Sequence, residues 1–267
     1  MRAFRDLART PDPTGSRLLL DGAHLVRDAR AAGLEFEAVV ISASRGHQTE
    51  EGALARDLQA DGTRVLTSTA QAFGAMSPVR APSGIVAIAL RAPVPPDRIC
   101  AGEDTFTLIA IDVQDPGNLG ALIRSAEAGG CSGVLVCGTS ANPFSWKAVR
   151  GSMGSALRLP VASGLDVDAA LNSISRAGGR VVAAVPQGGD APDSLEWRGR
   201  VALAIGGEGS GLHAEVLARA GALVTIPMTP PVESLNVAVA AAILVYAARQ
   251  QRALSESARS QGGGRRR

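Results

Sequence analysis

The feature that most constrains this chain is a set of short, continuously apolar runs in its second half. They lie at residues 106–113, 133–138, 180–186, 201–206 and 223–227. Because apolar residues do not alternate with polar ones, each run predicts a strand that is covered on both faces, as in a parallel sheet. Helical stretches fall between the strands, at residues 119–128, 146–152, 168–177, 214–220 and 235–251. This alternation predicts an α/β domain built on a parallel sheet.

The first half of the chain repeats the alternation in shorter segments and predicts a small α/β/α unit. Its strand-like runs are residues 17–22, 36–43, 64–68 and 84–90, with helical stretches at 23–33, 50–62 and 69–76. Three prolines in residues 91–104 favour a linker without regular structure. The expected division is a first unit over 1–92, a linker over 93–104, a second domain over 105–255 and a disordered tail over 256–267.

The composition excludes several classes of protein. Cys100, Cys131 and Cys137 form an odd set without a CxxC pair, so neither a disulfide scaffold nor a metal site is expected, and the thiols should be buried fillers in a reducing compartment. The balance of 27 basic and 25 acidic residues does not indicate a polycation. An aromatic content of 3% argues against a base-stacking platform, so any contact with nucleic acid should rest on phosphate and sugar.

The chain has no segment that predicts export or membrane insertion. The N-terminal residues lack the apolar core of a signal peptide. The longest apolar run, residues 237–248, is shorter than the ~20 residues that span a bilayer. A soluble, cytoplasmic protein is expected.

Three loops at the carboxyl ends of predicted strands hold polar residues that a core does not need, and open α/β sheets bind ligands at this edge. In the first, residues 111–130, Asn118 is placed to cap a helix that carries Arg124. The alternative is an ordinary Asx cap followed by a surface arginine. However, Arg124 lies among apolar residues, where a guanidinium needs an anionic partner or a phosphate.

The second loop, residues 201–215, is rich in glycine but fits neither common phosphate-binding pattern. A GxGxxG motif starting at Gly207 would need glycine at Leu212, and one starting at Gly209 would need it at Ala214. The chain also lacks the Gly-Lys-Ser/Thr of a P-loop. Glu208 would repel a pyrophosphate. Exposed amides beside one carboxylate suit a ligand with adenine, ribose and a cationic end, as in S-adenosylmethionine.

The third loop, residues 224–250, leads into a helix that is apolar on nearly every face and is therefore expected to be buried. Ser234 is the expected N-cap of this helix. Asn236 lies at the head of the helix, where its amide must find hydrogen-bond partners.

The order and spacing of these segments resemble the three motifs of the SpoU (TrmH-like) RNA ribose methyltransferases of the SPOUT superfamily. Residues 118–126 resemble the first motif and 205–212 the second. Residues 226–228 and 233–240 resemble the third, with Ala238 where serine is more usual. The first 90 or so residues are similar, less specifically, to the ribosomal-protein-L30e-like substrate-binding domain of many family members.

The resemblance implies a deep C-terminal trefoil knot, S-adenosylmethionine held by the knot loops, and a homodimer with the active site at its interface. The catalytic residues it implies are Arg124, Asn118, Glu208, Ser234 and Asn236. The cofactor-binding residues it implies are Ala184, Gly206, Gly207, Gly211, Ile226, Met228 and Leu235. Residues 149–155 resemble the RNA-facing segment of the family, which assigns RNA contact to Arg150 and Ser152.

We expect Arg124, the glycine-rich loop and the asparagine-headed helix to converge in one pocket, with Arg124 reaching cofactor that is held by the other subunit. Because an arginine side chain has a pKa above ~12, a clamp on the phosphate of the target nucleotide is favoured, with a general-base role as the alternative. The predicted function is methylation of a ribose 2′-hydroxyl in RNA, with 23S rRNA favoured because the first unit is large. A tRNA substrate, and an RNA-binding protein without catalysis, are the alternatives. A nucleotide-dependent oxidoreductase is disfavoured by the failed GxGxxG test.

Overall fold

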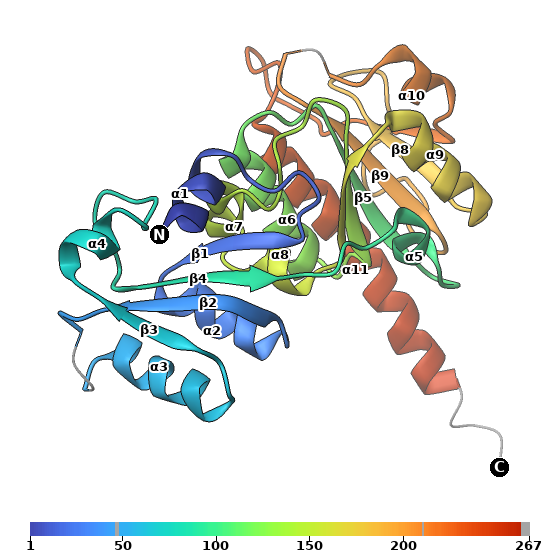
Figure 1. The fold of residues 1–267 in the computed structure, drawn as a ribbon. Coiled ribbons are helices and arrows are strands. Elements are labelled where there is room, and N and C mark those ends of the chain that lie inside the picture. The colour runs from blue at the N-terminus through green and yellow to red at the C-terminus, as the bar shows by residue number, and fades with distance from the viewer. Residues whose placement is uncertain (46–47, 210, 263–267) are drawn as a thin grey trace.

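The computed structural model describes residues 1–45, 48–209 and 211–262 (Figure 1). These described residues form two sheets, one of four strands and one of six. Within the described residues, no helix is both long and apolar enough to cross a membrane.

The six-stranded sheet confirms the predicted parallel architecture, since every pair of its neighbouring strands is parallel. The spatial order is β10-β8-β9-β5-β6-β7. The strands are β5 (Phe106–Ile111), β6 (Gly133–Cys137), β7 (Val161–Leu165), β8 (Arg180–Ala184), β9 (Val201–Gly206) and β10 (Ala222–Val224). Edge strand β7 was not predicted, because Ser163 and Gly164 interrupt its short apolar run.

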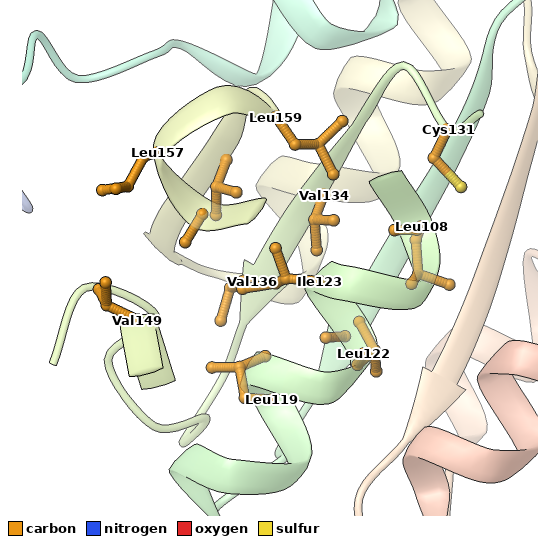
Figure 2. Close-up of a cluster of buried hydrophobic side chains, with 14 of the residues drawn as sticks. Leu108, Leu119, Leu122, Ile123, Cys131, Val134, Val136, Val149, Leu157 and Leu159 are labelled. Carbon is orange, nitrogen blue, oxygen red and sulfur yellow. The ribbon is translucent and has the colours of Figure 1, made fainter. Parts of the chain in front are cut away.

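Helices cover both faces of this sheet, which explains why its strands are apolar throughout. One face carries α6 (Pro116–Ala128), α7 (Trp146–Gly151), α8 (Ser155–Arg158) and α11 (Val237–Gly262) (Figure 1). The other face carries α5 (Pro96–Cys100), α9 (Val167–Arg176) and α10 (Ala214–Ala218). In β5, for example, Leu108 joins the first layer and Ile109 the second. Figure 2 shows Leu119, Leu122 and Ile123 of α6 packed beside Val134 and Val136 of β6.

The four-stranded sheet has the order β1-β4-β2-β3, and only the pair β2–β3 is parallel. Its strands are β1 (Arg17–Asp21), β2 (Glu35–Ser42), β3 (Val65–Ser68) and β4 (Ile85–Leu90). The helices of this unit are α1 (Arg2–Arg9), α2 (Ala23–Ala31), α3 (Glu50–Ala60) and α4 (Ala70–Gly74). Helix α1, which the sequence pattern did not predict, is held on the sheet by Phe4 and Leu7.

The Pro-rich segment between the sheets is not devoid of regular structure, which corrects the prediction for it. Pro96 begins helix α5 and lies at the first helical position. Proline is favoured there because its fixed φ suits the helix and its missing N–H would have no partner. Ile99 and Cys100 of this helix are buried against the sheet.

The two units are joined by direct side-chain contacts. The guanidinium of Arg91 lies 4.2 Å from the ring centroid of buried Phe144 and donates to the carbonyl oxygen of Val161 at 2.7 Å. Burial lowers the pKa of Arg91 to about 10. Arg158 donates to Asp28 of the first unit at 2.9 Å and to both carboxylate oxygens of Glu127 at 2.8 Å. These contacts fix the first unit beside α6 and α8.

Helix α11 is buried on one face only, so the prediction that it is buried all round is wrong for the single chain. Val237, Ala241, Leu244 and Val245 pack into the core, whereas an apolar stripe of Val239, Ile243 and Tyr246 is 48%, 41% and 45% exposed. The predicted tail, residues 256–267, begins within α11, which continues to Gly262, and residues 263–267 lie outside the described part.

The cysteines are buried, as predicted, and are expected to be unreactive in the folded protein. Burial raises the pKa of Cys100 to about 11 and that of Cys131 and Cys137 to about 12. Because the thiolate is the reactive form, titration with a disulfide reagent at pH 8 should label almost no thiol until denaturant is added, and then all three. Rapid labelling of the native protein would contradict this burial.

Candidate functional site

The three polar loops meet at the carboxyl edge of the six-stranded sheet. β5, β9 and β8 are adjacent parallel strands, so their ends lie side by side. The loop after β10 then leads into α11, which packs beside α6 in the same core layer.

Asn118, Glu208 and Asn236, one from each loop, form a hydrogen-bonded cluster. The side-chain amide of Asn118 donates to Glu208 Oε1 at 3.0 Å. The amide of Asn236 donates to the same oxygen at 3.0 Å and to Asn118 Oδ1 at 3.1 Å. The structure thus brings together three of the five predicted catalytic residues, and the Asn236 amide has the partners that its position was predicted to require.

The helix caps differ from those predicted. Asp115, not Asn118, caps α6, because its Oδ1 accepts from the Asn118 backbone N–H at 2.7 Å. Asn236, not Ser234, caps α11, since its Oδ1 accepts from the N–H groups of Ala238 at 3.0 Å and Val239 at 3.3 Å. Asn236 therefore caps a helix with its oxygen while its nitrogen binds Glu208 and Asn118.

A cavity of about 300 Å³ lies beside this cluster. All the residues predicted to bind cofactor line it: Ala184, Gly206, Gly207, Gly211, Ile226, Met228 and Leu235. Glu208 and Ser234 also line it, and Val224, Val237 and Leu244 close its apolar side. Its volume lies at the lower end of the range of about 300–1,000 Å³ that is typical of ligand sites.

The glycine-rich loop forms one wall of this cavity. It can do so only because Gly206 and Gly207, which lie very close to other backbone atoms, have no side chains. A Cβ at Gly206 would lie 2.3 Å from the carbonyl oxygen of Gly211, and one at Gly207 would lie 2.0 Å from the carbonyl oxygen of Asp112. The loop therefore presents backbone and one carboxylate, that of Glu208, to a ligand. Ser210 lies outside the described residues.

A second, more polar cavity of about 340 Å³ shares Glu208 and Val237 with the first. It is lined by Asp112, Gln114, Asp115, Asn118 and Thr139 as well. Asn118 and Glu208 thus stand where an apolar cavity meets a polar one.

Arg124 lines neither cavity of the single chain, and the expectation that it reaches the pocket of the other subunit stays a prediction. It is exposed on α6, in a hollow with His24, Glu127, Met153 and Arg158. Its guanidinium makes no hydrogen bond or ion pair within the described residues. No carboxylate in this part of the chain binds Arg124, so the phosphate that its apolar sequence neighbours also led us to expect stays a prediction.

The two predicted RNA contacts differ in position. Arg150 is exposed at the end of α7. Ser152 is fully buried, where its hydroxyl donates to the Val149 carbonyl at 2.8 Å and accepts from the Ala156 N–H at 3.3 Å. Ser152 therefore shapes the turn between two helices and does not face a ligand, which corrects the prediction for this residue.

One pair of polar residues at the site was missed by sequence reasoning. His213 Nε2 lies 2.6 Å from Asp112 Oδ2. Asp112 directly follows β5 and His213 directly precedes α10, so only the parallel pairing of β5 with β9 brings them together. The position of Asp112 at a strand end was the one signal available.

The fold and the site define an α/β protein with a nucleoside-sized cavity and a polar cluster at the carboxyl edge of its parallel sheet. The chain belongs to the SpoU rRNA Methylase family, whose model matches residues 105–246.

Similar proteins support this membership along most of the chain. RlmP of Bacillus subtilis, named as a 23S rRNA (guanosine(2553)-2′-O)-methyltransferase, is 31% identical over 229 residues, which cover 85% of this chain and 86% of RlmP. An uncharacterized tRNA/rRNA methyltransferase of Synechocystis is 32% identical over 240 residues, covering 88% and 84% of the two chains.

Two solved structures share the fold. An AdoMet-bound rRNA methyltransferase from Sinorhizobium meliloti superposes with a TM-score of 0.82 at 29% identity, covering 93% of each chain. The SpoU methyltransferase AviRb from Streptomyces viridochromogenes, also in complex with AdoMet, gives a TM-score of 0.83 at 26% identity, covering 94% of this chain and 97% of AviRb.

Proposed function

We propose that this protein is an S-adenosylmethionine-dependent RNA methyltransferase that methylates a ribose 2′-hydroxyl, and that its substrate is 23S rRNA. The observation that carries the proposal is the Asn118–Glu208–Asn236 cluster between an apolar and a polar cavity. RlmP, whose name specifies 2′-O-methylation of 23S rRNA, supports the reaction and the substrate class.

The residues of the first cavity fit S-adenosylmethionine. Apolar side chains such as Ile226 and Leu244 suit the adenine ring, and the backbone around Gly206 and Gly207 leaves polar groups for the ribose and the amino acid end. The Glu208 carboxylate at the cavity wall favours a cation. When bound, the cofactor would supply a methyl group on a positively charged sulfur, which would leave as a neutral thioether when the methyl group is transferred.

The chain's own residues would orient the attacking sugar. Asn118 and Asn236 hold Glu208 Oε1 at the boundary of the two cavities, so Glu208 can accept a hydrogen bond from a hydroxyl that enters from the polar side. Ser234 lies on the cavity wall beside this cluster. Positioning of this kind can contribute several kcal/mol to lowering the barrier.

Arg124 would serve the active site of the second subunit in a homodimer. Its exposed guanidinium, which is free within the described residues, suits a clamp on the phosphate of the target nucleotide. The exposed stripe of Val239, Ile243 and Tyr246 on α11 supports the dimer, because a second chain would cover it.

The finer features of the family complete the proposal. Residues 105–255 would be the methyltransferase domain, with α11 as the threaded element of a trefoil knot. Gln251 and Arg252 of α11 are held by the carbonyl oxygens of Leu195 and Trp197, as expected if the segment before β9 wraps the helix.

Residues 1–92 would be an L30e-like RNA-binding unit, with Arg150 beside it as a phosphate contact and residues 93–104 as the linker. The reaction would take place in the cytoplasm.

The function is tested by measuring transfer of radiolabelled methyl from S-adenosylmethionine to purified 23S rRNA and to tRNA, followed by mapping of ribose methylation. We expect one 2′-O-methylated nucleotide in 23S rRNA, which should also disappear from cells that lack the protein. Methyl transfer to tRNA alone would reject the substrate, and methylation of a base would reject the reaction.

Asn236 is expected to contribute to both stability and catalysis, and two substitutions separate the roles. Asn236→Ala removes a helix cap and should destabilise the protein by about 1 kcal/mol while lowering methyl transfer about 100-fold. Asn236→Asp keeps an oxygen that can cap α11 but places a second carboxylate beside Glu208. It should therefore keep the cap of α11 but lose both amide hydrogen bonds, and activity should fall at least as far as in the alanine variant. Loss of stability without loss of activity in the alanine variant would contradict the catalytic assignment.

A further inference from the structure

We propose that Asp112 and His213 form a clasp that holds the described residues of the glycine-rich loop, 206–209 and 211–212, in their ligand-binding conformation and thereby sets the affinity for S-adenosylmethionine. The identity of the ligand rests on the proposed function; the clasp itself rests on geometry alone.

Asp112 directly follows β5, and its side chain is held in place by hydrogen bonds. Its φ of +56° is left-handed, a conformation that aspartate tolerates better than most residues. Its Oδ1 accepts from the backbone N–H of Thr139 at 2.7 Å and from the Thr139 hydroxyl at 2.9 Å. These hydrogen bonds lower the pKa of Asp112, and the one from the Thr139 backbone N–H has the largest effect. The carboxylate is therefore ionised and tied to the segment after β6.

The glycine-rich loop is held at the end of β5 on both of its sides, by Ile111 at its start and by Asp112 at its end. At its start, the Gly207 N–H donates to the Ile111 carbonyl at 2.8 Å, and a Cβ at Gly207 would lie 2.0 Å from the Asp112 carbonyl oxygen. At its end, His213 Nε2 donates to Asp112 Oδ2 at 2.6 Å. Gly207 and Gly211 also form an isolated antiparallel bridge, which ties the start of the loop to its end.

Two features of this turn give the clasp a functional consequence. Gly206, Gly207 and Gly211 are on the wall of the 300 Å³ cavity, so displacement of the turn changes the shape of the cavity. The same turn carries Glu208, whose Oε1 accepts the amides of Asn118 and Asn236. Without the His213 contact, the end of the loop beyond Glu208 would be held less tightly, by the Gly207–Gly211 bridge and by the packing of Leu212.

His213 lies at the surface, so its contact with Asp112 can hold the loop without contributing much to the stability of the whole fold. Its side chain is 48% exposed, and exposed ion pairs add little to global stability. The charged groups nearest to the ring are Asp112 and, on the Nδ1 side at 4.0 Å, Glu215. Loss of the ring should therefore loosen the loop without lowering the melting temperature appreciably.

The test compares His213→Ala with His213→Gln, which keeps an N–H donor near the Nε2 position, and with Glu215→Gln as the matched control. We expect His213→Ala to weaken binding of S-adenosylmethionine in calorimetry about five- to tenfold, the effect of one charge-assisted hydrogen bond at a partly exposed site. His213→Gln should restore affinity to within about twofold of the wild type, and Glu215→Gln should not change it.

A second measurement does not depend on the cofactor. Hydrogen exchange of the Gly211 amide, which donates to the Gly207 carbonyl at 3.3 Å, should be about fivefold faster in ligand-free His213→Ala than in wild type. Unchanged exchange, or an affinity loss matched by Glu215→Gln or explained by a lower melting temperature, would overturn the clasp. Failure of the wild-type protein to bind S-adenosylmethionine, with exchange altered as expected, would instead reject the proposed function and leave the clasp standing.

Discussion

Arg124→Ala is expected to lower methyl transfer about a thousand-fold while leaving both the affinity for S-adenosylmethionine and the melting temperature unchanged. The side chain is exposed, makes no hydrogen bond or ion pair within the described residues and does not line the cofactor cavity, so its removal costs neither packing nor a cofactor contact. Single-turnover rates and calorimetry on the same preparation check this separation.

The chemistry expected of Arg124 can be tested with a conservative variant. Arg124→Lys retains the positive charge but not the planar fork that binds two phosphate oxygens at once. We therefore expect this variant to recover only a small part of the lost rate. Recovery of the full rate by lysine would show that charge alone is needed, and near wild-type transfer by Arg124→Ala would reject the residue as catalytic.

A mixed dimer tests whether Arg124 acts across a subunit interface. One subunit would carry Arg124→Ala and the other Asn236→Asp, with two affinity tags to purify the heterodimer. If Arg124 acts in trans, one of the two sites combines an intact arginine with an intact asparagine, and the heterodimer should show about half the wild-type rate. If it acts in cis, both sites are defective and the heterodimer should be as inactive as either parent.

The convergence of the three loops could be predicted because it follows from the architecture alone. Continuous apolar strands imply a parallel sheet, and a parallel sheet brings the carboxyl ends of its strands to one edge. Asn118, Glu208 and Asn236 each follow such a strand, and they meet within 3.1 Å of one another through their polar atoms.

Other parts of the site could not be predicted because they depend on packing between distant segments. Asp115 and Asn118 are equally able to cap a helix by residue type, and only the backbone path after β5 selects Asp115. Ser152 is polar in sequence, yet the close approach of α6 and α7 buries it. The Asp112–His213 contact joins residues 101 positions apart.

The position of Arg124 is the clearest example of this limit. Its distance from Asn118 along α6 places it more than one turn away from the cavity edge, on the face beside α2 of the first unit. The family resemblance, and not the pattern of apolar and polar residues, led us to expect that Arg124 reaches the site of the other subunit. The distance of Arg124 from both cavities of the single chain agrees with the proposal that it acts across a dimer interface.

Gly207→Ala is expected to weaken binding of S-adenosylmethionine about 100-fold and to destabilise the protein by about 1–3 kcal/mol. The added Cβ would lie 2.0 Å from the carbonyl oxygen and 2.7 Å from the carbonyl carbon of Asp112. Both are backbone atoms of a residue that is held by Thr139 and His213, so Asp112 cannot yield and the loop must move. That movement displaces the cavity wall and Glu208 together.

Gly221→Ala is the matched control, because it adds the same methyl group in the turn before β10, where the nearest atoms would be 3.6 and 3.7 Å away. Neither glycine has a left-handed φ, so the comparison isolates the steric effect from backbone preference. Calorimetry with S-adenosylmethionine and urea unfolding of both variants give the two quantities. Wild-type affinity in Gly207→Ala would mean that the cofactor does not depend on this wall, and the ligand assigned to the cavity would then have to be reconsidered.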